Sequence, residues 1–525
     1  MNQQDANSSD GSTCIKRHNA GLRLALLTAK RRCPRWIWQA LQSALAQQCA
    51  ELVLVADVSH AAQHSYPWMV EKYAAWERRR YLAAHGPLQA IDVVATGKSL
   101  IPLNSSDSTE LAAHLTISRA DVLLATPDAD HVKLDGVAVP VWSVQFGTSP
   151  HQHRFPGLWE VVHRSLSSVS LVETVPASAS PHILESIVAR TDPRSWIRNQ
   201  AALAEKASDL LRRWLLPVAA RKKRPSLELP ALTNPLHGDG SEANLAILRL
   251  LSRFAKHAIG SYLSVEQWQL AVDSSPDFSR LANPQVVTPP ADRFWCDPFL
   301  LEKDGALHVF IEEYPYRSGK GHIAVLSRSS SGEWSGPVTA LDKPYHLSYP
   351  FVFEHEGELL MLPETTAAGR VELCRCVRFP DQWELDTVLI DNIAGADGTL
   401  WYQDERWWLF LDVRDELCIF YADSLRGPWL PHRLNPVKSD ARSSRPAGRI
   451  FRNGEDVVRP AQDCSVQYGR EVVFNKITRL GVSDFEELEI GRLHTPWNGS
   501  TGCHTFNQAG NITVVDRLIQ RRKRR

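Results

Sequence analysis

The sequence lacks any long apolar run, since no stretch approaches the roughly 20 apolar residues that a membrane-spanning helix needs. It also lacks net charge, because 59 Lys and Arg residues balance 59 Asp and Glu residues. This balance excludes a whole-molecule attraction to nucleic acid. The nine cysteines show no metal-ligand spacing, and no phosphate-binding loop is present. We therefore expect a cytoplasmic protein with reduced cysteines and without metal, cofactor, nucleic-acid partner or stable membrane insertion.

The two ends of the chain carry no folding pattern. Residues 1–20 are polar and lack the apolar segment of a secretory signal, so we expect them to be disordered. Residues 518–525 end in the basic cluster Arg521–Arg525, which we interpret as a solvated tail rather than a contact with an anionic surface. The length of 525 residues and the 43% hydrophobic content indicate two or three globular domains between these ends.

Residues 21–216 alternate strand-like with helix-like runs. Apolar runs at 22–28 and 51–58 predict buried strands, and the segments near 36–41 and 196–216 predict helices. Strands alternating with helices predict an α/β domain whose mostly parallel sheet is covered on both faces. Residues 217–263 then predict a proline-rich linker followed by a helix that packs between domains, with a membrane-surface helix as the alternative.

The second half repeats itself. Residues 297–305, 349–357 and 397–405 are similar, and each is followed by an apolar strand that closes on a carboxylate. Those three carboxylates are Glu312, Glu364 and Asp412. Two weaker copies begin at Arg445 and His504.

A repeat of roughly fifty residues matches one four-stranded blade, so five copies predict an all-β, five-bladed β-propeller over residues 264–517. Residues 267–272 precede the first copy, and we expect them to pair with residues 511–515 and close the ring. A β-sandwich is the competing architecture, but it would not explain the repeat.

Hairpin geometry gathers the repeated polar residues at one mouth of the central channel. If each copy starts the innermost strand, the next strand returns to the same face. The mouth then holds the candidate catalytic residues Asp297, Glu364 and Asp397. The candidate sugar-binding residues there are Trp295, Glu312, Tyr349, Asp412, Arg445 and His504. Carboxylates suit sugar hydroxyls and aromatic rings suit the apolar face of a sugar, although the same acids could simply cap blade turns and pair with arginines.

Several motifs together resemble one family. Residues 293–299, 346–351, 363–365, 445–448 and 459–463 look like the propeller at the N-terminus of plant glucosamine inositolphosphorylceramide transferase. This resemblance adds Asp463 to the candidate sugar-binding residues. That propeller is in turn similar to family-43 glycoside hydrolases, which residues 421–429 also resemble.

The family-43 resemblance implies roles for three blades. Those enzymes place an Asp base in the first blade, an Asp modulator in the second and a Glu acid in the third. Asp297 matches the base. The second blade offers Tyr349 with Glu364 one strand later, and the third offers Asp397 instead of Glu. Hydrolysis would need two carboxyl groups about 5–5.5 Å or 6.5–9.5 Å apart.

The first half resembles the formyltransferase fold of methionyl-tRNA formyltransferase, through residues 141–147 and 155–161. Active members carry an Asn and a His on this strand and an Asp farther on. Ser143 and Gln145 stand at the first two positions, and no carboxylate lies between Glu173 and Glu185. Since Gln does not shuttle protons near neutral pH, the resemblance implies a degenerate scaffold kept for binding or assembly.

These observations predict a carbohydrate-active protein that handles a sugar or glycolipid precursor in cell-surface glycan or polysaccharide metabolism. Asp297 would act as the base, and Glu364 or Asp397 as the acid. Two alternatives stay open. One is a non-catalytic glycan-binding or scaffold module, and the other is a formyl- or acyl-type transferase acting through the N-terminal domain.

Overall fold

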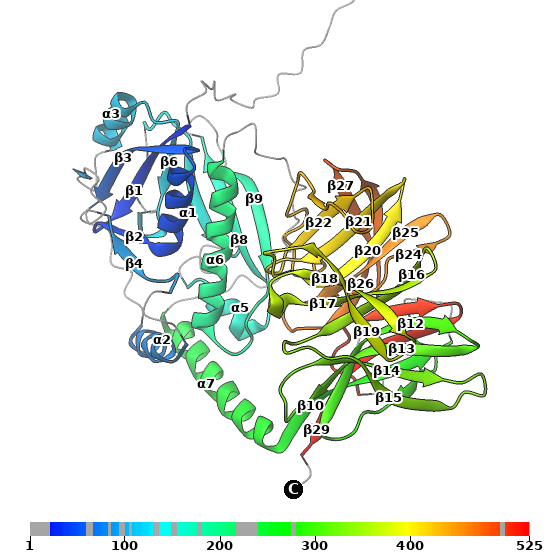
Figure 1. Cartoon of the computed structure of the whole chain (residues 1–525). Helices are drawn as coiled ribbons and strands as arrows, with labels where there is room; N and C mark the ends of the chain where they lie inside the picture. Colours follow the sequence, from blue (N-terminus) through cyan, green and yellow to red (C-terminus); the bar gives the residue numbers. More distant parts are fainter. Residues whose placement is uncertain are drawn as a thin grey trace, which may run out of the picture.

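The protein is described from a computed structural model, which places residues 21–58, 67–81, 86–93, 100–103, 108–129, 132, 134, 136–148, 155–175, 181–216, 240–274, 280–493 and 499–523. An α/β sheet domain precedes five four-stranded β-sheets (Figure 1). The expected disordered segment 1–20 and linker 217–239 lie outside the described residues. Within the described residues, no helix is both long and apolar enough to cross a membrane.

The N-terminal domain is built on one nine-stranded sheet of order β4-β2-β1-β6-β7-β8-β9, with β3 and β5 continuing from β1. Helices α1 and α6 cover one face, and α3 packs on the other through Leu111 and Leu115. The strands are β1 Leu22–Ala29, β2 Arg32–Pro34, β3 Ala50–Val58, β4 Ala90–Asp92, β5 Leu100–Leu103, β6 Val122–Ala125, β7 Val141–Phe146, β8 Ser167–Thr174 and β9 His182–Ala189. The helices are α1 Arg35–Ala46, α2 Trp68–Tyr81, α3 Ser108–Ser118, α5 Leu158–His163 and α6 Trp196–Leu215.

The sheet is covered on both faces, as predicted, but it is not mostly parallel. Strand β1 pairs in parallel with β3 and β6, and the pairs β3–β5 and β6–β7 are also parallel. The pairs β1–β2, β2–β4, β7–β8 and β8–β9 are antiparallel. Two of these are direct hairpins, and a short connection cannot carry the crossover that a parallel pair needs.

The second half forms the predicted five-bladed β-propeller. Blades 1 to 4 each come from one continuous segment. Their strands are β12 Arg293–Lys303, β13 Ala306–Pro315, β14 His322–Arg328 and β15 Trp334–Leu341; β16 Ser348–His355, β17 Glu358–Glu364, β18 Val371–Arg378 and β19 Gln382–Ile390; β20 Ala396–Gln403, β21 Arg406–Asp412, β22 Leu417–Ala422 and β23 Leu430–Pro431; β24 Phe451–Asn453, β25 Asp456–Asp463, β26 Glu471–Leu480 and β27 Phe485–Leu493.

Blade 5 closes the ring with strands from both ends of the propeller segment. It contains β28 Phe506–Ala509 and β29 Ile512–Arg522, completed by β10 Ser264–Asp273 and β11 Gln285–Val287. Strand β10 pairs with β29 from Ser264 opposite Arg522 to Asp273 opposite Thr513, which confirms the predicted closure. Because β29 reaches Arg522, it runs past the expected propeller boundary at residue 517 into the segment interpreted as a tail.

Helix α7, Gly240–Leu263, leads from the N-terminal domain into β10 (Figure 1). It buries Ala243, Ala246, Ile247 and Leu250 against side chains of α2, α5 and α6. Leu248, by contrast, is 51% exposed. The helix therefore packs mainly on the N-terminal domain and carries the chain to the propeller.

The two domains are joined at the face of the propeller that carries the candidate residues. The Val188 amide donates to the Ser439 carbonyl at 3.1 Å, and the Thr191 amide donates to the Ser465 carbonyl at 2.7 Å. Arg213 of α6 forms ion pairs with Glu185 and with Glu416 of the propeller. Glu416, Ser439 and Ser465 lie close in sequence to Asp412, Arg445 and Asp463. The N-terminal domain therefore rests beside the mouth of the channel, next to blades 3 and 4.

Candidate functional site

Three repeated positions on the inner strands have an unusual backbone. Asp297, Tyr349 and Asp397 have left-handed φ angles of 51°, 44° and 52°. At each one the ladder skips two residues, between Cys296 and Phe299 in blade 1 and at the matching places in blades 2 and 3. Such bulges re-aim side chains, and a non-glycine residue in this region costs about 1–3 kcal/mol. The repeated motif therefore encodes a bulge with a left-handed residue, which turns the side chains of Asp297 and Asp397 toward the channel.

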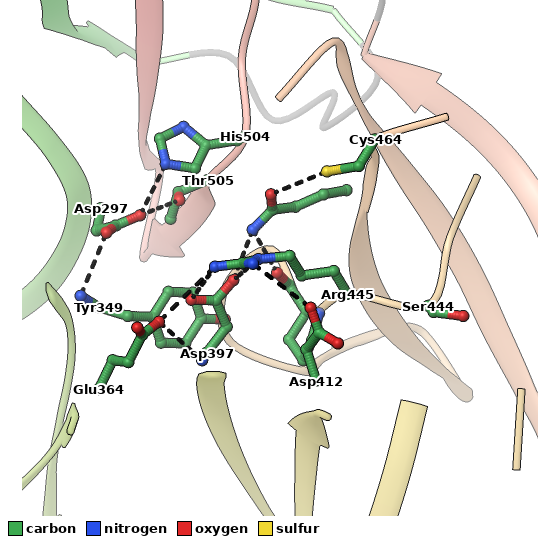
Figure 2. Close-up of polar contacts among 12 residues, drawn as sticks. Asp297, Tyr349, Glu364, Asp397, Asp412, Ser444, Arg445, Cys464, His504 and Thr505 are labelled. Atoms are coloured by element: carbon green, nitrogen blue, oxygen red, sulfur yellow. Dashed lines mark hydrogen bonds and ion pairs between the residues drawn. The ribbon is translucent and has the colours of Figure 1, made fainter. Parts of the chain in front are cut away.

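The carboxylates that close the second strands return to the same mouth. Glu312 pairs with Cys296, and Asp412 pairs with Ala396, each one residue before the bulge. Glu364 pairs with Ser348 in the same way. The predicted gathering of these acids is confirmed, because Asp297, Glu364, Asp397 and Asp412 lie around one centre (Figure 2).

His504 of blade 5 forms the first charge centre. Its Nε2 lies 3.1 Å from Asp297 Oδ1, and its Nδ1 lies 2.8 Å from Asp516 Oδ2. Burial disfavours the imidazolium, but these two carboxylates raise the pKa of His504 well above its usual value. Burial likewise opposes ionisation of Asp297, yet His504, the Thr505 hydroxyl and the Tyr349 amide lower the pKa of Asp297. Asp297 is therefore held as a carboxylate.

Arg445 forms the second charge centre. Its Nε donates to Asp397 Oδ2 at 2.6 Å, and its guanidinium lies 3.7 Å from Glu364 and 3.4 Å from Asp412 (Figure 2). Gln462 Nε2 also donates to Asp397 Oδ2, at 2.7 Å. Asp397 is thus the main counterion of Arg445, and Glu364 and Asp412 are more distant neighbours.

The remaining acids are pushed toward the protonated form. Burial and then the charge of Asp397 raise the pKa of Glu364 well above its usual value. Burial raises the pKa of Asp412 to about 7, against the opposing effect of Arg445. Burial and Asp297 raise the pKa of Glu312 to about 8. The mouth therefore combines Asp297, whose pKa is lowered, with Glu364, whose pKa is raised.

Solvent reaches this network through a few side chains. The Arg445 side chain is 22% exposed and that of Glu364 is 12% exposed. His346 is 37% exposed and lies 3.5 Å from Glu312. Asp412 Oδ1 is buried and has no hydrogen-bond partner among the described residues. A buried oxygen of this kind calls for a polar partner, such as water or a ligand hydroxyl.

Three of the predicted sugar-binding residues do not offer a contact surface at the mouth. Trp295 packs in a hydrophobic core, and its indole N–H donates to Glu313 at 2.9 Å. The Tyr349 ring is fully buried, so it cannot stack on a sugar. Asp463 is bound by Arg492 at 2.9 Å and by the Ser465 hydroxyl. Strand alternation does not predict side-chain direction across the bulge, which is why the two aromatic assignments differ from the structure.

Three residues of this region were not among the predicted site residues. Asp516 contacts His504, and its signal was present, because it closes the apolar run of the fifth copy just as Glu312 closes the first. Trp268 and Tyr468 pack on the His504 ring with centroid distances of 4.2 Å and 5.3 Å. Trp268 lies on the ring-closing strand, outside the repeat, so no repeat position marked it.

The side chains of Cys296, Asp297 and His504 lie close enough to be tested as metal ligands, with their ligand atoms within 4.8 Å of one another. Burial and the neighbouring carboxylate of Glu312 raise the pKa of Cys296 well above its usual value. Both the Cys296 thiol and the His504 imidazolium would have to release a proton to bind a metal ion.

Residues 266–508 match the family model described as the N-terminal domain of glucosamine inositolphosphorylceramide transferase 1. The protein of that name from Oryza sativa subsp. japonica is 35% identical over 245 residues, which cover 42% of this chain and 33% of the rice protein. Its Arabidopsis thaliana counterpart is 33% identical over 229 residues, covering 40% of this chain and 30% of that protein. The chain thus spans about a third of the length of these relatives. The resemblance read from the sequence is confirmed for this segment.

Two solved structures are also similar. A family 117 glycoside hydrolase from Zobellia galactanivorans aligns with 12% identity and a TM-score of 0.32, covering 48% of this chain and 90% of that one. An exo-β-1,3-galactanase from Clostridium thermocellum aligns with 11% identity and a TM-score of 0.32, covering 37% and 49%.

Proposed function

We propose that the propeller mouth binds a sugar or glycolipid precursor and cleaves or transfers a glycosyl group, in a cytoplasmic protein of cell-surface glycan metabolism. One observation carries this proposal. A single solvent-reached mouth holds an aspartate whose pKa is lowered and a glutamate whose pKa is raised. Two neighbouring carboxyl groups whose pKa values are shifted in opposite directions are typical of a catalytic acid and base. The names of the matched family and relatives also concern a sugar transferase.

The geometry assigns different tasks to the three candidate catalytic residues. Asp297 is ionised and would accept a proton or attack as a base or nucleophile. Glu364, whose pKa is raised, would donate a proton to the leaving oxygen. Asp397 is bound by Arg445 at 2.6 Å and by Gln462 at 2.7 Å, which favours a role in holding Arg445 rather than in proton donation. Glu364 is therefore the better acid.

The rest of the mouth would orient the sugar. Asp412 Oδ1, which has no hydrogen-bond partner among the described residues, can accept a hydrogen bond from a sugar hydroxyl. The partly exposed Arg445 guanidinium can donate hydrogen bonds to hydroxyl oxygens. Glu312 and His346 would contact the opposite side of the ligand. His504 and Asp516 would position Asp297 and favour its carboxylate form, and they would not contact the substrate.

Kinetics with paired substrates test these roles. An aryl glycoside with an activated leaving group needs little acid assistance, whereas a natural glycoside needs much. Glu364→Gln should therefore lower turnover of the natural glycoside by about 10²–10⁴-fold and spare the aryl glycoside. Asp297→Asn should abolish turnover of both, and Glu354→Gln, at an exposed carboxylate of β16, should change neither. Unchanged glycan binding and turnover in Asp297→Asn would remove the proposal.

A non-catalytic glycan-binding module is the second candidate. It is favoured by one observation, that Asp297 and Asp397 are already paired, with His504 and Arg445 respectively. This candidate predicts glycan binding that depends on Arg445, with no turnover of any aryl glycoside. Acid-dependent cleavage would exclude it.

For the N-terminal domain we propose the degenerate, formyltransferase-like scaffold role. Ser143 is partly exposed and Gln145 is exposed on β7, and neither can shuttle protons. The ion pairs and backbone hydrogen bonds to the propeller support a role in assembly. Binding of a folate by the full chain would instead favour the third candidate, a formyl- or acyl-type transferase.

A further inference from the structure

A second hollow lies between the N-terminal domain and the propeller. It is a cleft of about 910 Å³, lined by the ends of α5 and β9, the start of α6, helix α7, strand β10 and the loop before β26. Six arginines line it, against three carboxylates. In a chain without net charge, this is a strong local excess of positive charge.

The three carboxylates neutralise this excess only in part. Asp192 is paired with the cleft arginine Arg198 at 3.0 Å, and Glu471 lies 3.7 Å from the cleft arginine Arg470 and 3.5 Å from Arg492, which is outside the cleft lining. Glu266 accepts a hydrogen bond from Gln520 at 3.1 Å. Four cleft arginines have no ion pair with any described residue: Arg164, Arg190, Arg194 and Arg253.

The positive charges also repel one another. Burial and then the charges of Arg164 and Arg249 lower the pKa of Arg253, which lines the cleft and donates to the Val161 carbonyl. Burial and the charges of Arg249 and Arg253 lower the pKa of the neighbouring His163. A bound anion would relieve this repulsion, and arginine is the side chain best suited to hold a phosphate through paired N–H donors.

The cleft adjoins the mouth of the propeller and shares two aromatic wall residues with it. Tyr468 lines the cleft and lies between two guanidinium groups, with Arg190 at 5.5 Å on the cleft side and Arg445 at 5.3 Å in the mouth. Trp268, which also lines the cleft, packs on His504 at 4.2 Å. The cleft and the acid site therefore share part of one wall.

We propose that this cleft binds the phosphate ester of a ligand whose sugar occupies the propeller mouth. The proposal rests on the function proposed above and adds the chemical class of the substrate, a phosphorylated sugar. The phosphate contacts arginines that come from four separate elements of the N-terminal domain and α7, and the propeller supplies the sugar contacts. Substrate recognition then requires both domains, which gives the N-terminal domain a role in binding.

Isothermal titration with inorganic pyrophosphate tests the cleft without any sugar. Arg190→Gln combined with Arg194→Gln should weaken pyrophosphate binding at least about tenfold, since each substitution removes a charged hydrogen-bond donor. The control is Arg317→Gln, at an exposed arginine outside the cleft, which should leave binding unchanged. Absence of pyrophosphate binding, or equal affinity in all variants with unchanged melting temperatures, would overturn the proposal.

Three further measurements separate the sources of the phosphate and the two proposals. Tighter binding of glucose 1-phosphate than of glucose, lost in the double variant, supports a free sugar phosphate. Sedimentation with phosphatidylinositol vesicles but not with phosphatidylcholine vesicles, lost in the double variant, supports a lipid headgroup. Asp297→Asn should retain pyrophosphate binding. If that variant keeps full glycan binding and turnover while the double variant loses pyrophosphate, the sugar site fails and the phosphate site stands.

Discussion

Replacing Glu312 by Gln should stabilise the propeller at pH 8 and remove much of the pH dependence of its stability. Glu312 is buried beside Cys296, and burial and the charge of Asp297 raise its pKa from 4.5 to about 8. A glutamine has nearly the same shape but does not ionise. The variant therefore isolates the free energy of placing a carboxylate charge at the mouth.

The sign follows from proton binding in the two states. Between pH 4.5 and about 8 the folded protein keeps the Glu312 proton, and the unfolded chain has lost it. The folded state thus binds more protons in this window, so stability falls as the pH rises. Because folding raises the pKa of Glu312 from 4.5 to about 8, the free energy of unfolding should fall by about 5 kcal/mol across this window.

Urea unfolding followed by tryptophan fluorescence between pH 4.5 and 8.5 measures this effect. The difference in unfolding free energy between Glu312→Gln and the wild type should increase in favour of the variant by about 1.4 kcal/mol per pH unit between pH 4.5 and 8. A lost hydrogen bond would add only a constant offset. Glu354→Gln, at an exposed carboxylate, should run parallel to the wild type. A parallel curve for Glu312→Gln would refute the reasoning.

Three further outcomes are expected. Arg445→Met leaves Asp397 as an uncompensated buried charge and should cost about 3–5 kcal/mol, seen as a lower midpoint in urea than for the exposed control Arg452→Met. Glycan turnover should be bell-shaped with pH, because protonation of Asp297 and deprotonation of Glu364 each stop it, and the alkaline limb should vanish for aryl glycosides in Glu364→Gln. Arg213→Met removes the cation that pairs with both Glu185 and Glu416 at the domain junction and should lower the melting temperature by several degrees; an unchanged value would exclude Arg213 as a tie between the domains.

The propeller could be predicted from the sequence because its repeat fixes the register of each hairpin. Once residues 297–305 start an inner strand, Glu312 must return to the same face, and the same holds for Glu364 and Asp412. Ring closure followed from the apolar run before the first copy, and β10 does pair with β29.

The aromatic contacts could not be predicted in the same way. Trp295 lies two residues before the left-handed Asp297, and strand alternation does not extend through a bulge. The aromatic wall is instead formed by Trp268 and Tyr468, which lie outside the repeated motif. The cleft depends on how α6 and α7 pack beside the propeller, which no local pattern encodes. Its arginines are scattered between residues 164 and 470, so only the fold reveals them as one surface.

The most direct measurement is a structure of the protein with a bound oligosaccharide selected on a glycan array. The account predicts a sugar ring at the propeller mouth, with hydroxyls within hydrogen-bond distance of Glu364, Arg445 and Asp412 Oδ1, and with Asp297 facing the anomeric region. A sugar bound on the outer strands of the blades, with the mouth filled only by water, would contradict it.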